Sequence, residues 1–151
     1  MEKSWIGYST LRAKAHREPM SVAEPDPSLQ PRKPRILEKP WGRETILAET
    51  ECYAGKILFV ARGSRLSLQH HEHKSETMYL LHGRIRLSVG RSQDDLQEVE
   101  LGQGELIDLP VGTVHRVQAL EDSQIIEASS PELDDIVRLA DDFGREGTSA
   151  P

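Results

Sequence analysis

The chain has 151 residues, of which 36% are hydrophobic and 29% charged, and its formal net charge is −6. This size suits a single domain with one hydrophobic core. The acidic balance argues against a nucleic-acid or anionic-membrane partner, and no apolar run is long enough to span a membrane. The N-terminal residues lack the apolar segment of a secretory signal, and Cys52 is the only cysteine, so no intrachain disulfide forms. Together these features favour a cytoplasmic location.

The two ends of the chain differ in composition from its middle. Residues 1–34 combine several prolines with charged and small residues, and such a composition buries too little apolar surface to offset the loss of chain entropy. We therefore predict a disordered N-terminal extension over residues 1–34 and a short C-terminal tail over 147–151.

From residue 35 onward, short β-rich runs alternate with turn signals, most of them glycines. Many short strands at this spacing are typical of an all-β sandwich or barrel rather than of alternating α and β units. We predict a barrel over residues 35–130. The predicted strands are Thr45–Ala48, Lys56–Ala61, Arg65–His71, Thr77–Leu81, Arg84–Val89, Leu96–Leu101, Glu105–Leu109, His115–Leu120 and Gln124–Ala128.

Residues 131–146 are predicted to form a short C-terminal helix that packs on the barrel. Leu133, Ile136 and Val137 contribute to an apolar stripe at helical spacing. Gly144 is placed where a helix of this length would end, because glycine readily adopts the left-handed conformation of a helix C-terminus.

Two motifs that each begin with a glycine, over residues 63–83 and 104–115, supply the residue types that bind divalent transition metals. The set consists of three imidazoles and one carboxylate: His71, His73, Glu76 and His115. Side chains two residues apart on a strand face the same side of a sheet, so His71 and His73 share a face that a closed barrel brings near His115. We predict one divalent transition-metal ion at this site. The sequence does not distinguish among Zn, Mn, Fe, Ni and Co.

The same motifs resemble those of the cupin superfamily. The spacing Glu76–x6–Gly83 fits the superfamily, and the short gap between His73 and Glu76 matches the branch of type II mannose-6-phosphate isomerase domains. The resemblance covers about residues 35–146. Further stretches similar to this branch are Lys39–Gly42, Leu66–Gln69, Asp134–Leu139 and Phe143–Arg145. Positions that depart from its usual residues are Glu72, Lys74, Thr77, Met78 and Ala119.

The resemblance implies a cupin double-stranded β-helix, also called a jelly-roll barrel. It also implies a metal-dependent intramolecular oxidoreductase that isomerises an aldose phosphate to a ketose phosphate through a cis-enediol, as mannose-6-phosphate isomerase does. The small-molecule ligand would then be a sugar phosphate. In many relatives the domain follows a sugar-nucleotide transferase domain, which these 151 residues do not include, so transferase activity is not implied.

Three further residues are candidates for a catalytic role: Lys56, Gln69 and Arg116. Lys56 matches a lysine of the branch that would bind phosphate or stabilise an enediolate, although a solvated strand lysine explains it equally well. Gln69 shares a face with His71 and would bind a sugar hydroxyl or support a ligand, unless water alone satisfies it. Arg116 also matches the branch, but alternation turns it away from the interior and favours a structural ion pair. No residue is identified as the base.

Two other functions fit the same motifs. One is a stand-alone cupin that binds a metal and a small ligand without isomerase activity, and the other is a metal-dependent oxygenase, because one barrel hosts many chemistries. Alternation also turns Leu66 and Leu68 outward, and such an apolar face predicts a homodimer formed by contact between sheets.

Overall fold

The structure is a computed structural model that describes Asp26 and residues 29–147. The chain divides into two compact units, Met1–Arg32 and Lys33–Pro151, and the strands found among the described residues lie in the second. In the first unit, the Leu29 N–H donates a hydrogen bond to the Asp26 carbonyl oxygen (2.9 Å). The predicted N-terminal extension lies largely outside the described residues, as does the predicted tail beyond Gly147.

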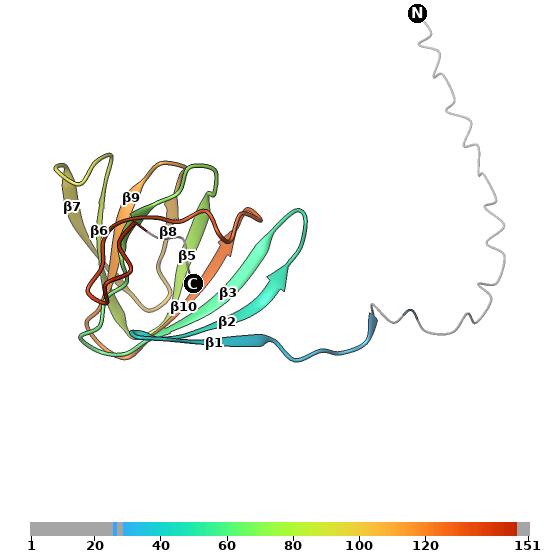
Figure 1. The fold of residues 1–151 in the computed structure, drawn as a ribbon. Helices are drawn as coiled ribbons and strands as arrows, with labels where there is room; N and C mark the ends of the chain where they lie inside the picture. Colours follow the sequence, from blue (N-terminus) through green and yellow to red (C-terminus); the bar gives the residue numbers. More distant parts are fainter. Residues whose placement is uncertain (1–25, 27–28, 148–151) are drawn as a thin grey trace, which may run out of the picture. The chain divides into compact units, whose positions relative to one another are not determined.

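The described part of the second unit folds as two antiparallel sheets that form a jelly-roll sandwich (Figure 1). Its strands are β1 (Arg35–Lys39), β2 (Gly42–Glu49), β3 (Ala54–Val60), β4 (Leu68–His70), β5 (Glu76–His82), β6 (Arg84–Gly90), β7 (Leu96–Gly102), β8 (Leu106–Leu109), β9 (Val114–Ala119), β10 (Ser123–Ser129) and β11 (Val137–Ala140). One sheet has the order β1-β2-β3-β10-β5-β8 and the other the order β11-β4-β9-β6-β7. The predicted all-β cupin fold is confirmed. No helix long and apolar enough to cross a membrane occurs among the described residues.

Every strand predicted from the turn signals is present, with bounds that shift by a few residues, and strands β1 and β11 were not predicted. Strand β1 has no buried residue, so it lacks the apolar alternation by which a strand is recognised. It pairs with β2 from Arg35↔Ile46 to Lys39↔Gly42 and forms an edge of its sheet.

The helix predicted over residues 131–146 is wrong. The segment forms turns and then strand β11, which pairs with β4 through Val137↔His70 and Arg138↔Gln69. Its apolar residues also suit a strand, and pairing with β4 satisfies backbone groups that would otherwise be left open at a sheet edge. A weak helical stripe does not compete with that pairing, because helix propensity is easily overridden by tertiary contacts.

The interior of the sandwich has an apolar end and a polar end. Alternate residues of the neighbouring strands β3, β10 and β5 are buried, and five of these ten buried residues belong to one hydrophobic cluster. Toward one end of each row a buried residue is charged instead: Lys56 on β3, Glu127 on β10 and Glu76 on β5. Because buried charges are costly unless they are paired, this end of the interior must hold a network of compensating groups.

The expected outward face of Leu66 and Leu68 is not formed. Leu68 is buried, and Leu66 is half-buried and packs against the hydrophobic cluster. Strand β4 has only three residues, so strict alternation does not extend back to position 66. The homodimer therefore remains a prediction that this pair of leucines no longer supports.

Two turn glycines with similar backbone angles provide a test of the packing around the strand ends. Gly63 and Gly83 have φ of +82° and +89°, and a Cβ at Gly63 would meet nothing within 4 Å. A Cβ at Gly83 would lie 2.5 Å from the Asp122 carbonyl oxygen and 2.5 Å from Ser123 Oγ. Gly63→Ala should therefore cost only the conformational penalty, about 1 to 2 kcal/mol, whereas Gly83→Ala should cost about 1 to 3 kcal/mol more through overpacking. Urea unfolding of both variants measures the difference, and equal losses would contradict this packing.

Candidate metal centre

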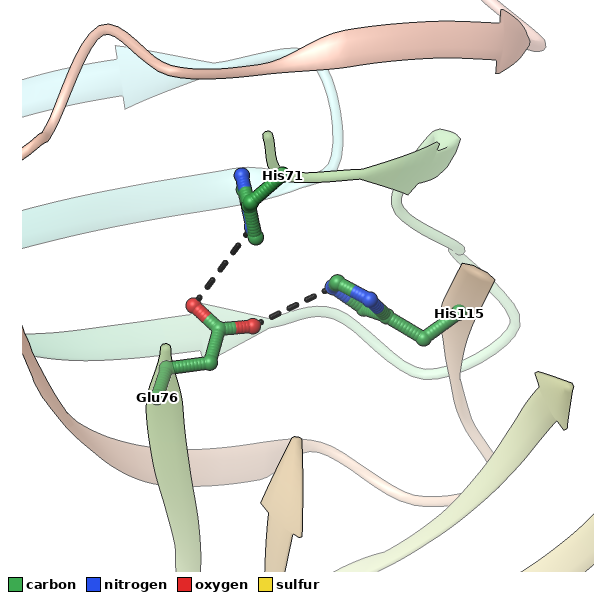
Figure 2. A group of neighbouring side chains, drawn as sticks. All are labelled: His71, Glu76 and His115. Carbon is green, nitrogen blue, oxygen red and sulfur yellow. Dashed lines mark ion pairs between the residues drawn. The ribbon is translucent and has the colours of Figure 1, made fainter. Parts of the chain in front are cut away.

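Three side chains from both sheets converge at the polar end of the interior (Figure 2). His71 follows β4 directly, Glu76 is the first residue of β5, and His115 lies on β9. The pairing Gln69↔His115 between β4 and β9 brings the two histidines together, with ring centroids 5.4 Å apart. His71 Nε2 lies 3.6 Å from Glu76 Oε2, and His115 Nε2 lies 3.1 Å from Glu76 Oε1. All three residues are buried.

The hydrogen bonds on the far side of each ring assign the tautomers. Nδ1 of His115 is 3.0 Å from the Thr113 carbonyl oxygen, and Nδ1 of His71 contacts the Asp135 carbonyl oxygen. A carbonyl oxygen only accepts, so in both rings we assign the proton to Nδ1, and Nε2 of the neutral ring is left as an acceptor. Both Nε2 atoms are buried and have no hydrogen-bond partner among the described residues.

Glu76 faces these acceptors as a carboxylate. Burial alone would raise its pKa, but the ammonium of Lys74, whose Nζ lies 2.6 Å from Glu76 Oε2, favours the charged form and helps to hold the pKa of Glu76 well below its ordinary value. Two imidazole lone pairs thus point at an anion with no proton between them, an arrangement that a bound cation stabilises. Two neutral imidazoles and one carboxylate are also the ligand chemistry of divalent transition metals. The group of His71, Glu76 and His115 can therefore hold a metal ion.

His73, the fourth predicted ligand, lies outside this group and is exposed. The alternation that would place it beside His71 ends with β4 at His70, and residues 71–75 form a loop. The structure thus brings together three of the four predicted ligands.

Asp135 organises that loop and was not identified as a site residue from the sequence. Its carboxylate accepts the backbone N–H groups of Glu72 (3.1 Å), His73 (2.6 Å) and Lys74 (2.8 Å), while its carbonyl oxygen accepts from His71. These bonds fix the loop between two ligands and orient the His71 ring, as outer partners of metal ligands commonly do. The available signal in the sequence was an aspartate in a turn. That signal does not reveal the distant partners of Asp135, because the pairing of β11 with β4 brings them near.

A pocket lies beside the triad, and Lys74 contacts both. Lys74 lines this pocket, and its Nζ lies 2.6 Å from Glu76 Oε2, whereas none of the triad residues is part of the lining. The lining also includes Trp41 and Gln69. Its charged side chains are Arg35, Lys39, Lys56, Lys74, Arg138 and Arg145 on the cationic side and Glu44, Glu49, Glu127 and Asp134 on the anionic side.

Of the three catalytic candidates, Lys56 and Gln69 line the pocket and Arg116 does not. The Gln69 amide oxygen accepts a hydrogen bond from Ser67 Oγ (2.6 Å), which orients the amide. Arg116 donates to the Leu66 carbonyl oxygen (2.9 Å) and forms an ion pair with Asp142 (3.1 Å), so its contacts are those of a structural residue.

Lys74 and Glu127 are pocket residues that the sequence analysis did not select. Lys74 Nζ is 3.0 Å from Glu127 Oε1, and Lys56 Nζ is 3.8 Å from the same oxygen. Burial lowers the pKa of Lys74, but the carboxylates of Glu127 and Glu76 outweigh burial and raise that pKa above its ordinary value. Lys74 is therefore an ammonium shared between the triad and the pocket.

Comparison with known proteins assigns the family. Residues 31–141 match the family described as mannose-6-phosphate isomerase C-terminal. The chain belongs to this family. The resemblance drawn from the motifs is thereby confirmed, and the matched residues overlap most of the predicted span of about 35–146.

The curated relatives are longer proteins. The chain is 31% identical over 117 residues to mannose-1-phosphate guanylyltransferase ManC of Salmonella typhimurium strain LT2, a match that covers 74% of this chain and 23% of the relative. It is 29% identical over 116 residues to mannose-1-phosphate guanylyltransferase of Escherichia coli K12, with the same coverage of 74% and 23%. The chain thus spans about a quarter of the length of these relatives.

Solved structures with the same fold include KdgF and an oxalate decarboxylase. KdgF from Halomonas sp. superposes with a TM-score of 0.58 at 24% identity, covering 67% of this chain and 91% of that one. Oxalate decarboxylase from Bacillus subtilis superposes with a TM-score of 0.60 at 21% identity, covering 70% of this chain and 30% of that one. At such identities the similarity shows the fold alone.

Replacing Asp135 tests whether the loop geometry supports metal binding. Asp135→Ala removes the acceptor of three backbone N–H groups, and loss of such outer partners typically lowers metal affinity about 10- to 100-fold. Asp122→Ala is the matched control, because Asp122 also accepts a backbone N–H, from Arg62 (2.8 Å), but lies away from the triad. Competition with a chromophoric chelator measures Zn²⁺ affinity for both. Equal affinities in both variants and the wild type would show that Asp135 does not position the site.

Proposed function

We propose that this chain is a metal-dependent sugar-phosphate isomerase of the mannose-6-phosphate type, which interconverts an aldose and a ketose through a cis-enediol. The observation that carries the proposal is a cationic pocket joined to the metal-ligand triad by Lys74. The resident ion would be one divalent transition metal held by His71, Glu76 and His115. The family supports the same ligand class, because its description names mannose-6-phosphate isomerase.

The charge of the pocket favours an anionic ligand. Six cationic side chains face four carboxylates in its lining, although the chain as a whole carries a formal charge of −6. Burial and the neighbouring charges of Arg145, Lys56 and Arg138 lower the pKa of Lys39, and Glu44 only partly offsets them. A phosphate group would relieve this crowding, and arginine is well suited to bind phosphate through paired hydrogen bonds.

The residues around the triad divide the chemistry of an aldose–ketose isomerisation between them. A bound metal would act as a Lewis acid that polarises the substrate carbonyl. The ammonium groups of Lys74 and Lys56 stabilise the negative charge that develops as the enediolate forms. The amide of Gln69, held by Ser67, is placed to hydrogen bond a sugar hydroxyl.

A second candidate function is a cupin that binds metal and a small anion without isomerising it. The observation that favours it is the pocket lining, from which all three triad residues are missing. In that case Lys74 would separate the ligand from the metal rather than connect them. No feature of the described residues favours the oxygenase.

Solvent exchange separates the two candidates. The full chain, loaded with each of Zn²⁺, Mn²⁺, Fe²⁺, Ni²⁺ and Co²⁺ in turn, is incubated with mannose-6-phosphate in D₂O and followed by proton NMR. We expect one of these ions to support formation of fructose-6-phosphate with deuterium at C1 and, through the reverse reaction, deuterium at C2 of mannose-6-phosphate, because the proposed mechanism removes the C2 proton and delivers a proton to C1. A variant carrying both His71→Ala and His115→Ala should show neither.

The binding alternative predicts a different result. Mannose-6-phosphate would raise the melting temperature of the metal-loaded protein, as any ligand specific for the folded state does, without deuterium incorporation with any of the ions. That outcome would overturn the isomerase and leave the pocket as a binding site.

A further inference from the structure

Glu127 occupies a central position among the charged residues of the pocket. It lies on β10, between β3 and β5, in register with Lys56 on one side and Met78 on the other. Its side chain is only 6% exposed and lines the pocket. Lys74 Nζ lies 3.0 Å from Glu127 Oε1 and 2.6 Å from Glu76 Oε2, so Glu127 shares one ammonium with a residue of the triad.

The other three carboxylates of the pocket are placed differently. Glu44 is paired with Lys39 (3.8 Å), and Glu49 is paired with Arg35 on an exposed part of β2. Asp134 is exposed. Among these lining residues, Glu127 is the carboxylate that contacts Lys74, the link between the pocket and the triad.

The other titratable groups at this position are less suited to take a proton. Glu76 is part of the triad, and Lys74 is held as an ammonium by two carboxylates. Glu127, in contrast, has both a buried place in the pocket and lone pairs to accept a proton. General bases need to lie within hydrogen-bond reach of the proton they remove, which the pocket face of Glu127 allows for a ligand bound beside Lys74.

We propose that Glu127 is the catalytic base and acid that carries the proton between C2 and C1 of the sugar. This inference rests on the proposed isomerase function and supplies the residue that the sequence left unassigned. Lys56 and Lys74 position its carboxylate from two sides.

The proton and electron balance needs no further reactant. The Glu127 carboxylate takes the proton from C2 of the aldose, the electrons of that C–H bond form the C1=C2 double bond, and the carbonyl electrons move to O1. The resulting cis-enediol then collapses as Glu127 returns its proton to C1 and a carbonyl forms at C2. The hydroxyl proton of O2 passes to O1 in the same conversion, so the ketose has the composition of the aldose.

The test compares three variants of the metal-loaded full chain. Glu127→Gln keeps the size of the side chain but does not accept the proton, so deuterium incorporation and isomerisation should fall about 10²- to 10⁴-fold. Calorimetric affinity for mannose-6-phosphate should stay within about threefold, because a base is not needed for binding. Glu100→Gln is the matched control, since it removes a strand carboxylate paired with Arg86 (2.8 Å) outside the pocket, and it should keep the wild-type rate.

Glu127→Asp keeps the test decisive if the glutamine variant does not fold. It retains the charge that compensates Lys56 and Lys74 and withdraws the carboxylate by one methylene, and a displacement of this size should lower the rate about 10²-fold without abolishing binding. Wild-type rates in both Glu127 variants, or in the aspartate variant alone when the other is unfolded, would overturn the assignment while leaving the isomerase standing. Absence of exchange in the wild type would overturn the isomerase itself, and the assignment with it.

Discussion

One buried carboxylate, Glu76, faces two imidazole nitrogens that carry lone pairs and no proton. Such a group of acceptors is unfavourable in a low-dielectric interior unless a positive charge lies among them. Lys74 supplies part of that positive charge from the pocket side. A divalent ion bound among His71, Glu76 and His115 would supply the rest. The remaining features of the polar end follow from this requirement, because the ammonium that serves Glu76 must itself be balanced by Glu127.

The fold meets this requirement because the inward-facing residues of three adjacent strands change from apolar to charged along the strands. Where β3, β10 and β5 pack against the second sheet, their inward residues are apolar and close-packed. Toward the other end the same inward rows carry Lys56, Glu127 and Glu76, and these charges are compensated through contacts with one another and with Lys74. The hydrophobic cluster thus holds the strands in register, and the register places the charges.

Much of the fold was accessible from the sequence because a strand's faces repeat every second residue. The turn glycines separated the strands, and the two motifs located His71, Glu76 and His115. His73 lies outside this group, because the alternation that would place it beside His71 ends with β4 at His70. Strand β11 was missed because its segment fits a helical stripe when tertiary pairing is ignored. The role of Asp135 was missed because its partners, the backbone N–H groups of residues 72–74, lie about 60 positions earlier in the sequence. The pairing of β11 with β4 brings them together, and local sequence does not encode that pairing.

The importance of Glu127 was also hidden in the sequence, although a signal was present. Its strand has an ordinary alternating pattern, and a single glutamate in the inward row becomes notable only when Lys56 and Lys74 are seen to share it.

The metal content of the purified full chain tests the central claim, that the triad binds a metal ion, most directly. Mass spectrometry after reconstitution should find about one divalent transition-metal ion per chain, and a folded His115→Ala variant should retain little of it. A wild type that takes up no metal, or a variant that holds as much as the wild type, would contradict the account.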